Sequence, residues 1–218
     1  MTRGIFHRGA ALKALFVFLF VCSLCGTCAG DSLPSEARVV AVFDGDTVLL
    51  DTGHRLRYLG IDAPEVAHDK TPAGCFGNEA KNANCNLVLH KKIRIEYDGP
   101  AYDSHGRILG YVFLPGGLLV NAELLRSGCA AVFGKGEGFR RRGEFVGYQG
   151  EAIDRRKGMW AACPVSQEPH YVANAVTLVF HRPGCSYARH RAVRHCKRFE
   201  SRWDCLKLGY SPCRWCKP

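Results

Sequence analysis

Residues 38–51, RVVAVFDGDTVLLD, indicate the fold class more strongly than any other stretch of the chain. Apolar and β-branched residues stand on both sides of Asp44-Gly45. An Asp-Gly pair between two such runs is typical of a tight hairpin turn. The stretch therefore predicts two antiparallel strands joined at this pair.

Three further segments alternate between apolar and polar residues with the same period of two. They are residues 54–61 (HRLRYLGI), 92–98 (KIRIEYD) and 107–114 (RILGYVFL). Side chains with this period line one face of a strand. The sequence thus predicts five strands in all.

Three segments are predicted to be helices, because their apolar residues recur with helical spacing or follow a capping residue. They span residues 78–91, 122–127 and 144–157. Asn121 is expected to cap the second helix, and Gly128 to end it. Residues 62–76 and 133–143, rich in Gly, Pro or Arg, are expected to be loops. The fold class is mainly β with helices (α+β).

The N-terminal 30 residues resemble a secretory signal peptide. Arg3, Arg8 and Lys13 precede an uncharged apolar run over residues 14–30 that ends in small residues. This predicts export to a periplasm or to the medium, with an uncleaved membrane anchor as the alternative. Because it is the one long apolar run, the sequence excludes a multipass membrane protein.

Charge is distributed unevenly along the 218 residues, whose formal net charge is +10. Residues 31–163 carry equal numbers of basic and acidic side chains, whereas residues 164–218 carry 10 basic and 3 acidic ones. We expect a main domain over residues 37–163, a linker over 164–170 and a small basic module over 171–218. A basic module favours an acidic partner such as nucleic acid, with a solvated basic face as the alternative.

Carboxylates gather at two strand ends. Asp44 and Asp46 lie at the first turn, and Asp62 and Glu65 follow the third strand. Oxygen ligands in such clusters suit a hard cation. With arginines nearby, they are also the groups that phosphodiester hydrolysis requires. Each cluster taken alone is more often a turn or a loop cap.

Three motifs in fixed order strengthen the interpretation. AVFDGDTVLL (residues 41–50), LRYLGIDAPE (56–65) and DSHGRILGY (103–111) resemble those of the thermonuclease (staphylococcal nuclease-like) family, over about residues 38–160. The resemblance implies a five-stranded OB-fold barrel with three helices. It also implies one calcium ion and hydrolysis of DNA and RNA to 3′-phosphate products.

The same resemblance implies roles for individual residues. Asp46 and Asp62 match the calcium ligands, together with the backbone carbonyl of Ala63. Glu65 matches the carboxylate that activates water. The remaining matches are the phosphate-binding arginines and a carboxylate near the metal: Arg57, Arg107 and Asp44.

Two features depart from the family pattern. Ser104-His105 stands where the reference enzyme has Lys-Tyr, and the tyrosines that flank a bound base are not evident. Phe133, Phe139 or Arg140 could supply the stacking contact, although for Phe133 core packing is the favoured role.

The C-terminal module contains a second chemical cluster. Three cysteines and a histidine have a spacing that suits tetrahedral zinc: His181, Cys185, Cys213 and Cys216. The pattern resembles the small metal-binding module of the Ada DNA-repair protein. There a cysteine takes the place of His181 and accepts methyl groups, so alkyl transfer is not expected here. A disulfide knot without zinc remains the alternative.

Six cysteines of the exported chain are not assigned to zinc. Their expected pairing, from proximity in sequence, is Cys75–Cys85, Cys129–Cys163 and Cys196–Cys205, and other connectivities stay open.

These observations predict an exported, calcium-dependent, micrococcal-nuclease-like endonuclease. Its expected partners are DNA and RNA substrates, without stable membrane association after signal cleavage, and it is expected to be a monomer. The alternative is a nucleic-acid-binding protein that has weak or no catalysis. A structural or adhesive secreted protein has no positive feature in its favour.

Overall fold

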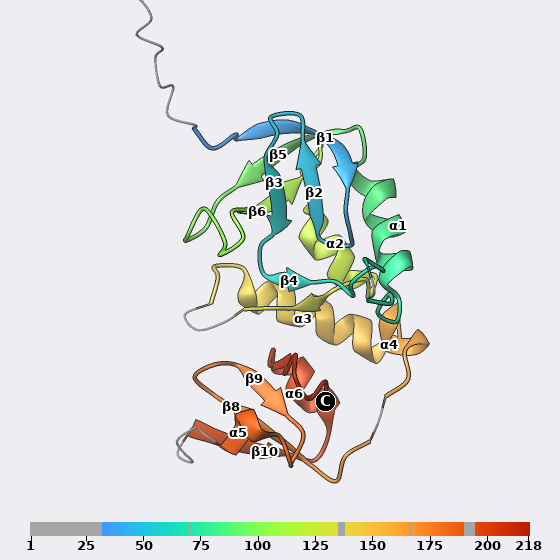
Figure 1. Ribbon diagram of the computed structural model, residues 1–218, viewed down its shortest axis with the longest axis vertical. Helices are drawn as coiled ribbons and strands as arrows, with labels where there is room; N and C mark the ends of the chain where they lie inside the picture. Colours follow the sequence, from blue (N-terminus) through green and yellow to red (C-terminus); the bar gives the residue numbers. More distant parts are fainter. Residues whose placement is uncertain (1–31, 70, 135–137, 166, 190–194) are drawn as a thin grey trace, which may run out of the picture. The chain divides into compact units, whose positions relative to one another are not determined.

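The hairpin predicted over residues 38–51 is present in the computed structural model of the chain, as strands β1 (Glu36–Val42) and β2 (Thr47–Leu50) (Figure 1). The structure describes residues 32–69, 71–134, 138–165, 167–189 and 195–218. The predicted signal peptide lies outside these residues. Residues 34–218 form one compact unit.

Five strands close into a barrel in the order β1-β2-β3-β6-β5, and β5 returns to β1. The strands not yet introduced are β3 (Arg55–Tyr58), β5 (Lys92–Glu96) and β6 (Ile108–Phe113). β3 and β6 pair in parallel, whereas the other neighbours are antiparallel. Their inward residues are completely buried, among them Val39, Val48, Leu56, Ile108 and Val112. The predicted α+β fold with a five-stranded barrel is confirmed.

The third predicted strand is interrupted. Gly60 has a φ of 82°, in the region that favours glycine, and the chain turns there. Beyond it, β4 (Ile61–Asp62) leaves the barrel and pairs with β7 (Ala131–Val132) in a two-stranded sheet. The interruption therefore separates Asp62 from the barrel strand that precedes it.

The three predicted helices are present, and a short fourth follows them. They are α1 (Gly77–Val88), α2 (Val120–Arg126), α3 (Arg142–Asp154) and α4 (Met159–Ala162). Within the described part of the chain, no helix has the length and apolar character that a bilayer span requires.

The prediction that Asn121 caps α2 is wrong. Leu119 precedes the helix, and Asn121 is completely buried inside it. The Asn121 side chain accepts a hydrogen bond from the Val112 amide and donates one to the Leu59 carbonyl, both at 2.9 Å. The residue thus satisfies backbone groups that the barrel strands leave unpaired.

Gly45 in the first turn is needed for close packing. A Cβ atom at this position would lie 2.5 Å from the Cβ of Ala63 and 2.9 Å from that of Ala80. The turn that carries the first carboxylates is therefore pressed against both the 62–76 loop and α1.

The C-terminal segment has its own four-stranded sheet, in the order β10-β8-β9-β11. Its elements are β8 (Tyr171–Asn174), β9 (Val179–His181), α5 (Ser186–Arg189), β10 (Cys196–Phe199), α6 (Arg202–Lys207) and β11 (Ser211–Pro212). The sequence of residues 171–180, YVANAVTLVF, predicts a single strand, but in the structure it forms a hairpin of β8 and β9. The Asn174 side chain accepts hydrogen bonds from the amides of Val176 and Thr177, which stabilises the turn.

A small hydrophobic core lies beneath this sheet, and α3 contributes to it. Tyr171, Phe180 and Leu206 are buried there together with Ile153 of α3. The core thus joins the C-terminal segment to the last long helix of the main domain. The boundaries proposed at residues 163 and 171 stay a prediction.

Candidate active site

The turn between β1 and β2 places a buried carboxylate, Asp46, at the centre of the candidate site. Asp46 is 2% exposed. One of its oxygens accepts a hydrogen bond from the Ala63 amide at 2.6 Å, and the other accepts from the Thr47 hydroxyl at 3.0 Å and from Arg57. The turn and the 62–76 loop are thus joined through one side chain.

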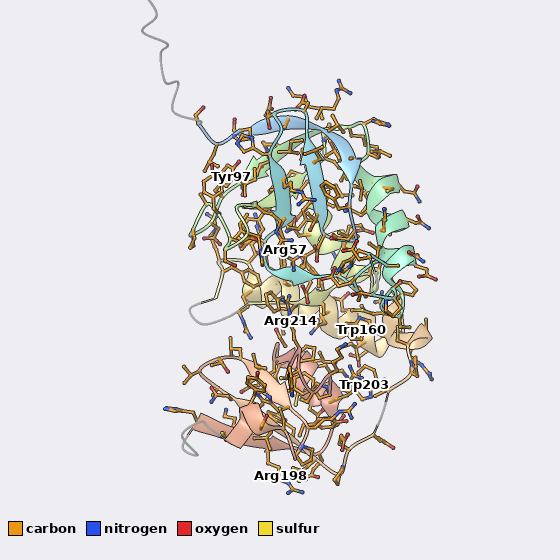
Figure 2. All side chains as sticks on the ribbon, viewed as in Figure 1. Arg57, Tyr97, Trp160, Arg198, Trp203 and Arg214 are labelled. Carbon is orange, nitrogen blue, oxygen red and sulfur yellow. A yellow bond between two sulfur atoms is a disulfide. The ribbon has the colours of Figure 1, made fainter. Side chains whose placement is uncertain are left out.

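Arg57, which Figure 2 labels, extends from β3 and bridges two carboxylates. Its Nη1 bonds Asp46, and its Nη2 bonds Asp62 Oδ1 at 2.5 Å. Burial opposes the charge of Arg57, but the two carboxylates outweigh it and raise the pKa of the guanidinium. Burial raises the pKa of Asp62 despite the neighbouring Arg57.

Asp44 adds a third carboxylate to the turn. It accepts a hydrogen bond from the Asp46 amide at 2.9 Å, while its own carbonyl accepts one from buried Asn84 of α1 at 3.0 Å. Burial and the charge of Asp46 raise the pKa of Asp44 to about 6. Three carboxylates around one buried guanidinium form an all-oxygen, negatively charged set of donors, which fits a hard divalent cation.

Glu65 is exposed on the 62–76 loop, and packing fixes the backbone of the loop beneath it. Its carbonyl accepts a hydrogen bond from Gly74 at 2.8 Å. A Cβ atom at Gly77, the first residue of α1, would lie 2.2 Å from the same carbonyl oxygen. A glycine at the start of α1 therefore lets the loop approach the helix and present the Glu65 carboxylate to solvent.

Arg107 lies just before β6, on the strand face that Arg57 also uses. Arg57 is paired with Leu109 across the parallel β3–β6 ladder, and Arg107 is two residues before Leu109. Alternate residues of a strand share a face. The Arg107 guanidinium bonds Asp103 at 2.7 Å, and the amides of Arg107 and His105 also donate to this carboxylate. Burial would raise the pKa of Asp103, but these hydrogen bonds lower it.

The two phenylalanines proposed as stacking residues have different surroundings. Phe139 packs against Phe145, with ring centroids 5.4 Å apart, and lies so close to Gly60 that a Cβ there would clash at 2.6 Å. Phe133 is half-buried, and the guanidinium of Arg214 lies 4.9 Å from the centroid of its ring. Phe139 is therefore a packing residue, whereas Phe133 faces a cation.

Two contributors to this region were missed by sequence reasoning. Asn84 supports the carboxylate turn from α1, and it accepts a hydrogen bond from buried Tyr58 at 2.9 Å. Arg214, from the C-terminal segment, donates a hydrogen bond to Asp62 at 3.1 Å. Arg214 stands 152 residues after Asp62, and no local pattern in the sequence connects them.

The four residues proposed as zinc ligands lie together. The ligand atoms of His181, Cys185, Cys213 and Cys216 are all within 4.8 Å of one another. The Arg182 amide donates to the Cys216 sulfur at 3.3 Å. Burial by itself would raise the pKa of Cys213, but backbone N–H groups of Trp215 and Cys216 lower it. Soft sulfur and imidazole donors at such spacing fit a tetrahedral zinc ion.

The expected disulfide pairing is wrong. Cys75 is bonded to Cys163, which is 88 residues away in sequence and follows α4. Cys85, Cys129 and Cys205 are free thiols. Proximity in sequence failed as a guide because the chain returns past the 62–76 loop only after the barrel and all four helices of the main domain are complete.

Comparison with known proteins shows that part of this chain is similar to known nucleases. The family model for staphylococcal nuclease homologues matches residues 55–162. A thermonuclease of Staphylococcus hyicus is 31% identical over 166 residues, covering 74% of this chain and 98% of that protein. An uncharacterized endonuclease of Escherichia coli is 33% identical over 129 residues, covering 58% and 77%. The endonuclease YncB of Bacillus subtilis is 38% identical over 96 residues, covering 41% and 44%.

Proposed function

The chain belongs to the family of staphylococcal nuclease homologues, and from this premise we propose that it is a calcium-dependent nuclease that hydrolyses DNA and RNA to 3′-phosphate products. It is a micrococcal-nuclease-like hydrolase. The observation that carries the proposal is the cluster of Asp46, Asp62 and Arg57, with the exposed Glu65 three residues after Asp62 on the same loop.

Each residue of the cluster has a task in this proposal. Asp46, Asp62 and the carbonyl of Ala63 would hold calcium, with Asp44 supporting Asp46 through its amide. When bound, the ion supplies positive charge that offsets charge developing on the phosphate. Glu65 takes a proton from the attacking water, which its solvent-facing position allows.

The two arginines bind the phosphate. Both guanidiniums present planar, fixed donors that can pair with two phosphate oxygens, as a lysine cannot. Arg57 is held by its carboxylates and Arg107 by Asp103, so neither side chain has to be ordered when substrate arrives. Their shared strand face supports simultaneous contact with one phosphodiester.

Digestion assays test the proposal. Purified protein should degrade plasmid DNA and RNA with calcium, stop with a chelator and leave 3′-phosphate ends. Glu65→Gln should lower the cleavage rate by about 10²–10⁴-fold, because it removes a general base. Glu79→Gln, an exposed acid on α1, is the matched control and should cleave like the wild type. Wild-type protein that binds nucleic acid without cleaving it would contradict the proposal and favour a binding protein.

The Cys/His cluster is proposed to hold a structural zinc ion through His181, Cys185, Cys213 and Cys216. Elemental analysis of the purified protein should give one zinc per chain. Cys185→Ser should lose it, whereas Cys85→Ser, a cysteine outside the cluster, should retain it. A zinc-free wild-type protein with its cluster cysteines paired would instead support the disulfide alternative.

Export is proposed as well. The leader-like residues 1–30 and the disulfide between Cys75 and Cys163 both suit a protein that folds outside the cytoplasm. N-terminal sequencing of protein recovered from the periplasm or the medium should begin near residue 30. The protein is proposed to act as a monomer, which light scattering would test.

A further inference from the structure

Arg214 connects the C-terminal segment to the candidate active site. Its Nη2 donates to Asp62 Oδ1, which is the same oxygen that receives the Nη2 group of Arg57. One carboxylate oxygen of a proposed calcium ligand therefore lies between two guanidiniums. Figure 2 labels both arginines.

Most hydrogen-bond donors of the Arg214 guanidinium are not used by Asp62. Its side chain is 66% exposed, and it uses one N–H group for Asp62 out of the five that a guanidinium carries. The guanidinium lies over the ring of Phe133, which limits its motion while leaving its edges open. The next residue, Trp215, is also exposed, and the centroid of its ring lies 5.6 Å from that of Tyr187. An exposed arginine among exposed aromatic rings is typical of surfaces that bind single-stranded nucleic acid.

The loop that carries Arg214 is fixed at both ends. Arg214 lies between Cys213 and Cys216 of the Cys/His cluster, and the Cys213 amide bonds the Phe180 carbonyl at 2.9 Å. Just before the loop, the Ser211 hydroxyl donates to the Val132 carbonyl at 3.1 Å.

The hydrogen bond between Ser211 and Val132 connects the loop to the strands of the candidate site. Val132 of β7 pairs with Ile61 of β4, and Asp62 is the last residue of β4. The structure therefore holds the loop against β7, the strand that pairs with β4, and β4 carries its partner carboxylate Asp62.

The ion pair between Arg214 and Asp62 is not explained by a contribution to the folding stability of the protein. An ion pair with one side chain two-thirds exposed contributes little to folding. In the site, however, the carboxylates of Asp44, Asp46 and Asp62 would repel the phosphate of a substrate, and each added cation offsets that repulsion.

We infer that Arg214 is a third phosphate-binding arginine of the nuclease site, presented by the loop of the Cys/His cluster. Its ligand is the phosphodiester backbone of a nucleic acid lying across Asp62. The inference rests on the proposed nuclease function, and it gives the C-terminal segment a direct part in cleavage.

Kinetics on a short single-stranded oligonucleotide test the inference, because so short a substrate limits contacts elsewhere on the basic segment. The full-length, metal-loaded protein is compared with Arg214→Ala, Arg214→Lys and Arg198→Ala. Arg198 is an exposed arginine of the same segment that pairs with Glu200, and its removal changes the charge equally. Arg214→Ala should lower kcat/KM about tenfold or more, Arg198→Ala should remain within about twofold, and Arg214→Lys should lie between wild type and Arg214→Ala.

Binding gives a second readout that does not depend on cleavage. In a Glu65→Gln background, the slope of log Kd against log salt concentration should fall by about 0.7 when Arg214 becomes alanine, since one phosphate contact is lost. Arg214→Lys should keep the slope, because lysine keeps the charge. Thermal unfolding and zinc content should match the wild type in all variants.

Two outcomes would overturn the inference. One is an Arg214→Ala variant with wild-type kcat/KM and salt slope. The other is an equal loss in Arg198→Ala, which would assign the effect to the overall charge of the segment. A wild-type protein without cleavage would instead contradict the proposed function, while the salt slope would still report on the phosphate contact.

Discussion

Asp46 is the residue whose surroundings explain most of the candidate site. It is buried, it receives a hydrogen bond from the loop that carries Glu65, and it pairs with Arg57. A buried carboxylate needs such partners, because leaving it unpaired costs several kcal/mol. The requirement to satisfy Asp46 thus positions the turn, the loop and the arginine together.

The two strand-borne arginines should respond differently to substitution. Arg57→Ala and Arg107→Ala should both lower cleavage by about 10²–10³-fold, since each removes a phosphate donor. Arg57→Ala should also lower the free energy of unfolding by about 3–5 kcal/mol, because it leaves Asp46 buried without its cation. Arg107→Ala should cost about 1 kcal/mol or less, because its pair with Asp103 is partly exposed.

Urea unfolding without calcium, alongside the cleavage assay, measures both effects. Equal stability losses in the two variants would contradict this account of the buried pair.

At the scale of single residues, sequence reasoning succeeds where motif and structure coincide. Asp46, Asp62 and Arg57 stand in two short motifs, and the structure brings them into contact. Arg214 could not be predicted in this way. Its place depends on how a separate sheet packs, and nothing in the residues around it encodes that packing.

At the scale of elements, α3 links the main domain to the C-terminal segment through one buried amide. Gln149 accepts a hydrogen bond from the Val132 amide at 2.7 Å and donates one to the Leu206 carbonyl at 2.6 Å. Gln149 is completely buried. The helix therefore connects β7 with α6 in addition to packing against both.

Gln149→Ala should lower the free energy of unfolding by about 2–4 kcal/mol, because two buried backbone groups lose their partner. Glu151→Ala, an exposed substitution on the same helix, should change it by about 0.5 kcal/mol or less. Urea denaturation measures both variants, and a Gln149→Ala protein as stable as the control would show that water replaces the amide.

The predicted elements were correct where period and length were clear, as in the five barrel strands and three helices. They were wrong where one side chain decides the local conformation. Asn174 turns an alternating run into a hairpin, and Asn121 serves the strand ladder in place of a helix end. Asparagine can satisfy backbone groups in several ways, and only the tertiary contacts select among them.

At the scale of the whole molecule, the disulfide joins distant parts of the main domain. It ties the loop that ends at Phe76 to the residue that follows α4. Cys75→Ser, Cys163→Ser and the double substitution should each lower the free energy of unfolding by about 2–5 kcal/mol, since all three open the same long loop.

Urea denaturation tests whether the three variants lose the same free energy of unfolding. Cys85→Ser, at a free thiol, is the control and should cost less. Additive losses from the two single substitutions would mean that the cysteines act separately.

The positive charge of the chain is also distributed unevenly over the whole molecule. The main domain is balanced in charge, and seven of the ten excess positive charges lie in residues 164–218, which pack on α3 and supply Arg214 to Asp62. Sequence counting located the excess, but it could not show that part of the basic segment reaches the carboxylates.

The disulfide and the proposed zinc site require opposite redox conditions. The bond between Cys75 and Cys163 exists only where thiols are oxidised, whereas the proposed zinc site requires three cysteines to remain thiolates. A strong reductant would open the first, and an oxidant acting before zinc arrives would consume the second. The yield of complete protein in any preparation should therefore depend on the order in which the chain meets metal and oxidant.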